Sequence, residues 1–237
     1  MADTLITNAV YVPDGRLVGT GLLADSGNVN HGMYIGPTLT ADAHVFSVFA
    51  APEDKDWIAL YNDTVGPTGE CICYFDVING VKGTEGSSIF AAGIEGPYRG
   101  GYTGGADLDF YRCWIGFTGT AAAHTLVLLA ANGDGSLPFE GDPINPSTYF
   151  WQAQCELGSR PSSPIVTTGA AATRVADNLQ YDILDGYAKG TIACKVIADA
   201  AAKEEGVIVT LVGDTDLPEF HTDADEHISM KALPAPG

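Results

Sequence analysis

Short stretches in which apolar and polar residues alternate recur along this chain of 237 residues, and loops rich in Gly, Pro and Asp separate them. Residues 44–49 (HVFSVF) place Phe46 and Val48 on one face of a strand and Val45 and Phe49 on the other. Further strands are predicted at 4–12, 33–35, 57–61, 71–77, 88–92, 110–117, 124–130 and 148–156. This spacing is typical of an antiparallel sandwich, so we predict an all-β jelly-roll β-sandwich.

The composition changes after about residue 157, where Pro, Ser, Thr, Ala and Gly dominate residues 158–176. The chain beyond this segment contains two more strand candidates, 191–197 and 207–212, and the one helix candidate, 198–205. We therefore predict two parts: the jelly-roll sandwich over residues 1–178, and a small β-rich C-terminal arm with an acidic tail over residues 179–237.

Acidic residues dominate the charge, with 30 Asp and Glu against 11 Lys and Arg and a formal net charge of −19. Binding to nucleic acid requires cationic groups that replace counterions, so no nucleic-acid partner is expected, and anionic membranes are disfavoured for the same reason. No apolar run approaches about 18 residues, so no membrane span is expected. The first residues lack the basic and apolar regions of a signal peptide.

The chain contains an odd number of cysteines, five, and none of them forms a CxxC pair. Cys71 and Cys73 are two apart in a predicted strand, so both thiols point to one face. No second pair has the spacing of a zinc site. We expect most of the cysteines to be small buried side chains in a protein that folds in a reducing compartment.

Several segments together resemble a jelly-roll module of tailed-phage virion proteins, which is related in fold to concanavalin-like lectins and carbohydrate-binding modules. They are FSVF at 46–49, FDVING at 75–80, FYRC at 110–113, FWQAQCE at 150–156 and TRVAD at 173–177. The family pattern for the fourth segment is F-W-G-A-Q-x-E, so Gln152 stands where the family has Gly. Phe110 likewise replaces the first aromatic residue of a W-Y-R segment. The motif residues for which we expect a structural role are Phe150, Trp151, Glu156, Arg174 and Asp177.

The resemblance implies a non-enzymatic structural protein of a phage particle, assembled in the cytoplasm of the bacterial host. The chain is short and has no repeat or coiled-coil shaft, which favours a capsid decoration, a head fibre or a short tail component over a complete tail fibre. We expect a homo-oligomer, with a trimer as the first choice, that contacts major capsid or tail proteins. The low charged fraction, 17%, suits close packing of copies.

A second hypothesis is a receptor-binding carbohydrate-binding module on a tail fibre, with a host glycan as ligand. Tyr98 and Tyr102 lie in a predicted glycine-rich loop, 93–106, and with Trp57 they are candidates for stacking on sugar rings. The alternative for Trp57 is packing inside the sandwich or between subunits. Arg174 has a natural local partner in Asp177, which favours a structural ion pair there.

A third hypothesis is a glycoside hydrolase, which requires two carboxylates facing one cleft. Asp107 and Asp109 are two apart, and Glu156 lies on another predicted strand. No nucleophile elbow or phosphate-binding loop occurs, so we expect no enzyme and no catalytic residues.

No cofactor is expected, with a divalent cation such as calcium as the only exception considered. The even spacing of four residues in the acidic tail would place them on one face of an extended segment, where they form a candidate metal site. These are His221, Asp223, Asp225 and His227. Asp134, in the sequence NGDG, is a weaker candidate for calcium, because the other positions of a calcium loop are missing.

Overall fold

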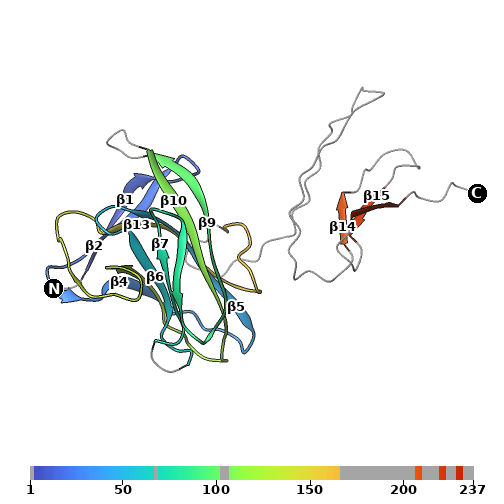
Figure 1. Cartoon of the computed structure of the whole chain (residues 1–237), viewed down its shortest axis with the longest axis horizontal. Coiled ribbons are helices and arrows are strands. Elements are labelled where there is room, and N and C mark those ends of the chain that lie inside the picture. The colour runs from blue at the N-terminus through green and yellow to red at the C-terminus, as the bar shows by residue number, and fades with distance from the viewer. Residues whose placement is uncertain are drawn as a thin grey trace, which may run out of the picture. The chain divides into compact units, whose positions relative to one another are not determined.

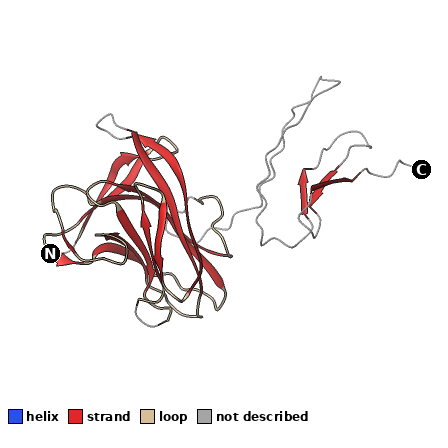
Figure 2. Ribbon diagram, viewed as in Figure 1, coloured by secondary structure: helices blue, strands red, loops and turns tan. Residues whose placement is uncertain are grey.

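The computed structural model describes residues 3–66, 69–101 and 107–165, and the backbone of short strands at 206–209, 219–222 and 228–231. The chain divides into two compact units, Met1–Val175 and Ala176–Gly237 (Figure 1). Every regular element of the described residues is a strand, as Figure 2 shows. The all-β prediction is therefore confirmed, and the described part of the chain contains no helix that could cross a membrane.

One layer of the first unit, here called the front sheet, has the antiparallel order β1-β2-β13-β5-β10-β9. Its strands are β1 (Thr4–Tyr11), β2 (Leu17–Leu23), β5 (Ala43–Pro52), β9 (Ile89–Gly101), β10 (Asp107–Thr118) and β13 (Thr148–Leu157). The sheet closes on itself, because Tyr11 of β1 pairs with Gly101 of β9. Strands that are far apart in the sequence, such as β2 and β13, are therefore neighbours.

The other layer, the back sheet, has the antiparallel order β4-β11-β6-β7-β8. Its strands are β4 (His31–Ile35), β6 (Trp57–Asn62), β7 (Ile72–Asp76), β8 (Val81–Glu85) and β11 (Leu126–Ala131). A short pair, β3 (Asn28–Val29) with β12 (Phe139–Glu140), lies outside both sheets. The two layers form the predicted antiparallel sandwich.

The main core fills the space between the two sheets. The front sheet contributes alternate residues of β5 and β10, and the back sheet contributes alternate residues of β6, β7 and β11. Its fully buried members of largest volume include Phe46, Phe75, Phe117, Ile58 and Leu128. Apolar burial on this scale is the dominant stabilising term for a sandwich.

A second, smaller cluster lies on the other face of the front sheet and includes Val10, Val12, Phe49, Phe110 and Tyr149. Strand β5 is consequently buried on both faces: Phe46 and Val48 belong to the main core, whereas Phe49 belongs to the second cluster. The curling of the front sheet creates this inner space, because it brings β1 toward β9 and β10.

Three predictions about strand faces are confirmed. Phe46 and Val48 share one face of β5, opposite Phe49. Cys71 and Cys73 are both fully buried in the main core. Trp57, Ala59 and Tyr61, which were predicted to share one face of a strand, belong to one cluster on the outer face of the back sheet.

The predicted loop at 93–106 is wrong over residues 93–101, which continue strand β9. The glycines in this stretch permit close packing instead of forming a loop. A Cβ at Gly93 would lie 2.7 Å from the indole of Trp114, and one at Gly100 would lie 2.6 Å from the carbonyl oxygen of Tyr11. Strands β2 and β8 were also missed, because their Gly and Lys residues weaken the apolar alternation.

The second unit contains β14 (Gly206–Val209), β15 (Glu219–Thr222) and β16 (Ile228–Lys231), which form an antiparallel sheet in sequence order. This sheet accounts for the predicted β-rich arm. The expected boundary at residue 178, the strand candidate at 191–197 and the helix candidate at 198–205 lie outside the described residues.

Candidate functional site

The most distinctive region of the sandwich lies on the face of the front sheet that points away from the main core, where aromatic rings and polar groups meet. Phe49 of β5 lies at its centre, 4.9 Å between ring centroids from Trp151 of β13 and 5.4 Å from Tyr98 of β9. Phe49 is 5% exposed, whereas Tyr98 is 38% exposed and Trp151 is half-buried. We call the set Tyr98, Phe49, Trp151, Arg112 and Trp114 the aromatic face.

Arg112 of β10 supplies the positive charge of the aromatic face. Its guanidinium lies 5.5 Å from the centroid of the Phe49 ring, and Nη2 donates a hydrogen bond of 3.1 Å to Ser47 Oγ. Burial lowers the pKa of Arg112, and the nearby charges of Glu95 and Glu156 partly oppose this effect. Arg112 is 5% exposed, and its Nε has no hydrogen-bond partner among the described residues.

The chain leaves the sandwich across this side of the sheet through residues 158–165, here called the strap. Glu156 accepts hydrogen bonds from Ser162 N at 2.8 Å and from Ser162 Oγ at 2.5 Å. Gln154 Oε1 accepts one from Ile165 N at 2.8 Å, and Arg160 lies 5.8 Å from the ring centroid of Trp114. The Gln and Glu of the FWQAQCE segment therefore fix the direction in which the chain continues.

We predict that Glu156→Ala releases the strap and leaves the sandwich folded. The substitution removes both acceptors of Ser162, so the free energy of unfolding falls by about 1–2 kcal/mol. Hydrogen exchange measured by NMR checks this, because the amide of Ser162 loses its acceptor and should exchange faster. Glu140→Ala, at an exposed position of β12, is the matched control. Unchanged protection of Ser162 in Glu156→Ala would contradict the role of Glu156.

Gln152 occupies the position where the family pattern has glycine, and its backbone has a φ of 47°. It lies in a β-bulge, because Trp151 pairs with Phe49 and Gln154 pairs with Ser47. This left-handed conformation is one that glycine adopts without strain. Gln152 in this bulge therefore carries local strain that a glycine would not.

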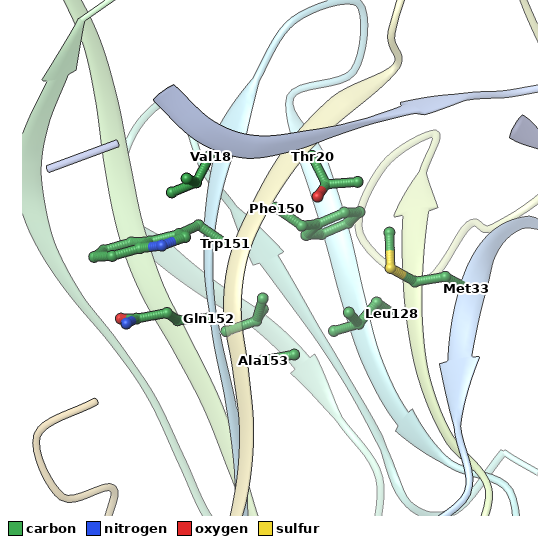
Figure 3. A pocket seen from close by; sticks show the side chains of 9 residues that line it. Val18, Thr20, Met33, Leu128, Phe150, Trp151, Gln152 and Ala153 are labelled. Carbon is green, nitrogen blue, oxygen red and sulfur yellow. The ribbon is translucent and has the colours of Figure 1, made fainter. Parts of the chain in front are cut away.

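The same bulge lines a small pocket of about 130 Å³ beside β13 (Figure 3). Trp151 and Gln152 lie on one side of the strand, and Phe150, Met33 and Leu128 lie on the other. The side-chain Oε1 of Gln152 is buried and has no partner among the described residues. The walls are largely apolar, so the pocket offers few polar groups to a ligand.

We predict that Gln152→Gly raises the free energy of unfolding. Relief of the left-handed strain contributes about 1–2 kcal/mol, which exceeds the loss of about 0.5–1 kcal/mol from the greater freedom of glycine in the unfolded chain. Denaturant unfolding provides the measurement. Ala153→Gly, the neighbouring control without a positive φ, should lower stability. An equal loss of stability in both variants would contradict the strain at residue 152.

The residues predicted to bind a glycan are not brought together. Tyr98 belongs to the aromatic face of the front sheet. Trp57 is half-buried on the outer face of the back sheet and packs with Ala59 and Tyr74. The two rings therefore lie on opposite sides of the sandwich, and Tyr102 lies outside the described residues. Sequence reasoning missed Phe49 and Arg112 as members of the aromatic face, because only strand pairing places them beside Tyr98.

The carboxylates proposed for a hydrolase are also separated. Asp109 and Cys113 are four residues apart on β10, so their side chains share one face of the strand. Arg112 lies on the opposite face. Glu156 holds the strap. The side chain of Asp107 lies outside the described part of the chain.

The candidate metal ligands of the acidic tail cannot be assembled from the described residues. His221 lies in β15, of which only the backbone is described. Asp223, Asp225 and His227 lie outside the described residues, as do Arg174 and Asp177. Asp134 accepts hydrogen bonds from Thr84 N at 2.7 Å and from Thr84 Oγ1 at 3.1 Å, so its carboxylate connects the turn after β11 to strand β8.

A cluster that the sequence did not suggest joins Asp3, Asp25 and His31. His31 is fully buried, with Nδ1 2.7 Å from Asp3 Oδ1 and Nε2 within 3.1 Å of the carbonyl oxygens of Gly27 and Phe139. Both ring nitrogens face acceptors, an arrangement that favours the doubly protonated, positively charged ring. Burial alone would lower the pKa of His31, but the hydrogen bonds to Asp3 and the two carbonyls outweigh it and raise the pKa.

The described cysteines fit the structural role expected of them. Cys71, Cys73 and Cys113 are buried and Cys155 is half-buried, and all four are free thiols. Burial raises the pKa of Cys71, Cys73 and Cys155 to about 12, so these thiols are protonated and unreactive at neutral pH. Cys194 lies outside the described residues.

Comparison with known proteins does not extend this description. A scan against protein-family models finds no match for the chain, and a search of the curated proteins finds no similar sequence. The function therefore has to be argued from the sandwich, the aromatic face and the strap.

Proposed function

We propose that this protein is a non-enzymatic structural component of a tailed-phage particle, as a capsid decoration, a head fibre or a short tail component. The observation that carries the proposal is that each part of the FWQAQCE segment has a separate structural task. Phe150 enters the main core, and Trp151 enters the aromatic face. Gln152 forms the bulge, and Glu156 holds the strap. These separate tasks support the proposal, because they fall on the positions that carry the resemblance.

Assembly with copies of itself and with other virion proteins follows from this proposal. The net charge of −19 keeps free subunits apart in solution, so contacts have to form through uncharged surface. Exposed apolar side chains of the sandwich provide such surface: Leu5, Ile6, Leu17 and Val18 on β1 and β2, and Tyr34 and Ile35 on β4. The partners would be neighbouring subunits and major capsid or tail proteins, joined in the bacterial cytoplasm.

Light scattering of the purified full chain tests the trimer. A trimer has a mass of about 74 kDa, three times the 24.7 kDa of one chain. Mass spectrometry of washed particles from a phage stock carrying the gene tests the setting, and the chain should be retained at a fixed ratio to the major capsid protein. A chain that stays in the lysate while the particles are complete without it would contradict the proposal.

A second candidate function is recognition of a glycan on the host surface. The specific observation in its favour is the row Tyr98–Phe49–Trp151, in which a buried ring lies between two partly exposed rings. Aromatic rings with a few polar groups beside them are typical of small-ligand sites. The two functions are compatible in one virion protein.

Adsorption of phage to host cells separates the two candidates. If the aromatic face binds a glycan, Tyr98→Ala lowers adsorption, whereas Ile144→Ala, at an exposed loop residue between β12 and β13, leaves it unchanged. If neither variant affects adsorption while deletion of the protein weakens the particle, the glycan function fails and the structural function remains.

A further inference from the structure

Arg112 is a buried cation, 5% exposed, and no carboxylate among the described residues forms an ion pair with it. Within the same residues, its guanidinium donates a hydrogen bond from Nη2 to Ser47 Oγ. Buried charges in proteins are normally paired, because an uncompensated charge in a low-dielectric site is costly.

The two nearest acidic residues do not fill this role. Glu156 already accepts hydrogen bonds from Ser162 and from Gln154 Nε2 at 2.7 Å. Glu95 of β9 lies opposite Arg112 of β10 in the strand register. Its side chain is exposed, and the ion pairs of the described residues do not include one between Glu95 and the guanidinium. Because Nε itself is buried, an acceptor from outside the chain has to approach the guanidinium through the small part of Arg112 that stays exposed, 5% of the residue.

Trp114 supplies a second unmatched donor on the same face of β10. Its side chain is 4% exposed, and its Nε1 has no partner among the described residues. Arg112 and Trp114 are two residues apart on one strand, so both side chains point to the side of Phe49 and Ser47. Two buried N–H groups, Arg112 Nε and Trp114 Nε1, thus have no acceptor within the described part of the chain, and both lie near the row Tyr98–Phe49–Trp151.

We propose that the aromatic face binds an acidic saccharide, whose carboxylate pairs with Arg112. A guanidinium matches a carboxylate with two parallel hydrogen bonds, and a neutral sugar would leave the charge unpaired. The sugar ring would rest against Tyr98 and Trp151, the two partly exposed rings, with Phe49 beneath them. This inference rests on the second candidate function and adds the chemical class of the ligand.

Titration of the full chain with free saccharides tests the proposal. The acidic probes are galacturonic acid, glucuronic acid and N-acetylneuraminic acid, and galactose and glucose are the neutral controls. At least one acidic probe should bind about tenfold more tightly than its neutral counterpart, since a hydrogen-bonded charge pair contributes about 1.5–3 kcal/mol. Arg112→Gln should remove that preference while still showing a cooperative unfolding transition.

Glu95→Gln keeps the test decisive if Arg112→Gln does not fold. It removes a negative charge that competes for Arg112, so the acidic probe should bind more tightly to this variant. If Glu95→Gln instead destabilises the protein and no acidic probe binds, Glu95 is the internal partner of Arg112 and the proposal is overturned. Binding of a glutamate-containing peptide, without binding of any saccharide, would also overturn it.

The acidic specificity and the glycan function can fail separately. If neutral and acidic sugars bind with equal affinity and Trp151→Ala abolishes this binding, the role of Arg112 is overturned. Recognition of a glycan by the aromatic rings would then still stand. If the protein is present in the particle but binds none of the sugars, only the structural function remains.

Discussion

Phe150→Ala lowers the free energy of unfolding by about 3–5 kcal/mol, the usual loss for a buried Phe. Phe150 is 3% exposed and belongs to the main core, so its removal leaves a cavity between the two sheets. Its position beside the existing pocket limits how far the neighbours can close the gap. Urea unfolding monitored by circular dichroism measures the change.

Tyr34→Ala is the control for Phe150→Ala, because Tyr34 is an aromatic residue of the back sheet that is 75% exposed. Its free energy of unfolding should stay within about 0.5 kcal/mol of the wild-type value. A loss below about 1 kcal/mol in Phe150→Ala would mean that the ring does not lie between two packed layers, and the sandwich would be wrong at its centre.

His31→Gln lowers the free energy of unfolding by about 3 kcal/mol at acidic pH. This is the low end of the loss that follows removal of one partner of a buried ion pair, because Asp3 stays partly exposed. The pKa of His31 is raised in the folded protein above the ordinary value of 6.5. The charged ring therefore contributes its full stabilisation below about pH 6.5, and this contribution is lost as the pH rises through the raised pKa. Unfolding measured from pH 5 to pH 9 should show the decline in the wild type and a flatter profile in His31→Gln.

Two controls accompany the pH series. His44 is also buried, but its ring contacts Thr40 instead of a carboxylate, so His44→Gln should keep the wild-type decline. Asp3→Asn removes the negative charge and should reduce the decline as His31→Gln does. A wild-type stability that is constant, or that rises over this pH range, would contradict a charged His31.

The strand faces could be predicted from the sequence wherever one face of a strand is buried. The alternation of Phe46, Val48 and Phe49 is visible in the letters, because each side chain meets one of two apolar clusters. The continuation of strand β9 over residues 93–101 could not be predicted, because glycine usually signals a turn. There Gly93 is needed to make room for the indole of Trp114 from the neighbouring strand, which no local pattern reveals.

The candidate site was harder to predict, because it depends on pairings between distant strands. Phe49, Tyr98 and Trp151 lie on β5, β9 and β13, and only the strand order places them in a row. His31 and Asp3 likewise meet through the fold, since nothing in their sequence spacing indicates a contact. By contrast, Glu156 and Ser162 are six residues apart, and the motif already marked Glu156 as structural.

Electron cryo-microscopy of the purified phage particle tests the central claim most directly. The account predicts density on the head or the tail into which the sandwich of residues 3–165 fits, with the exposed apolar side chains of β1, β2 and β4 against neighbouring subunits. Complete particles in which all surface density belongs to other proteins would contradict it.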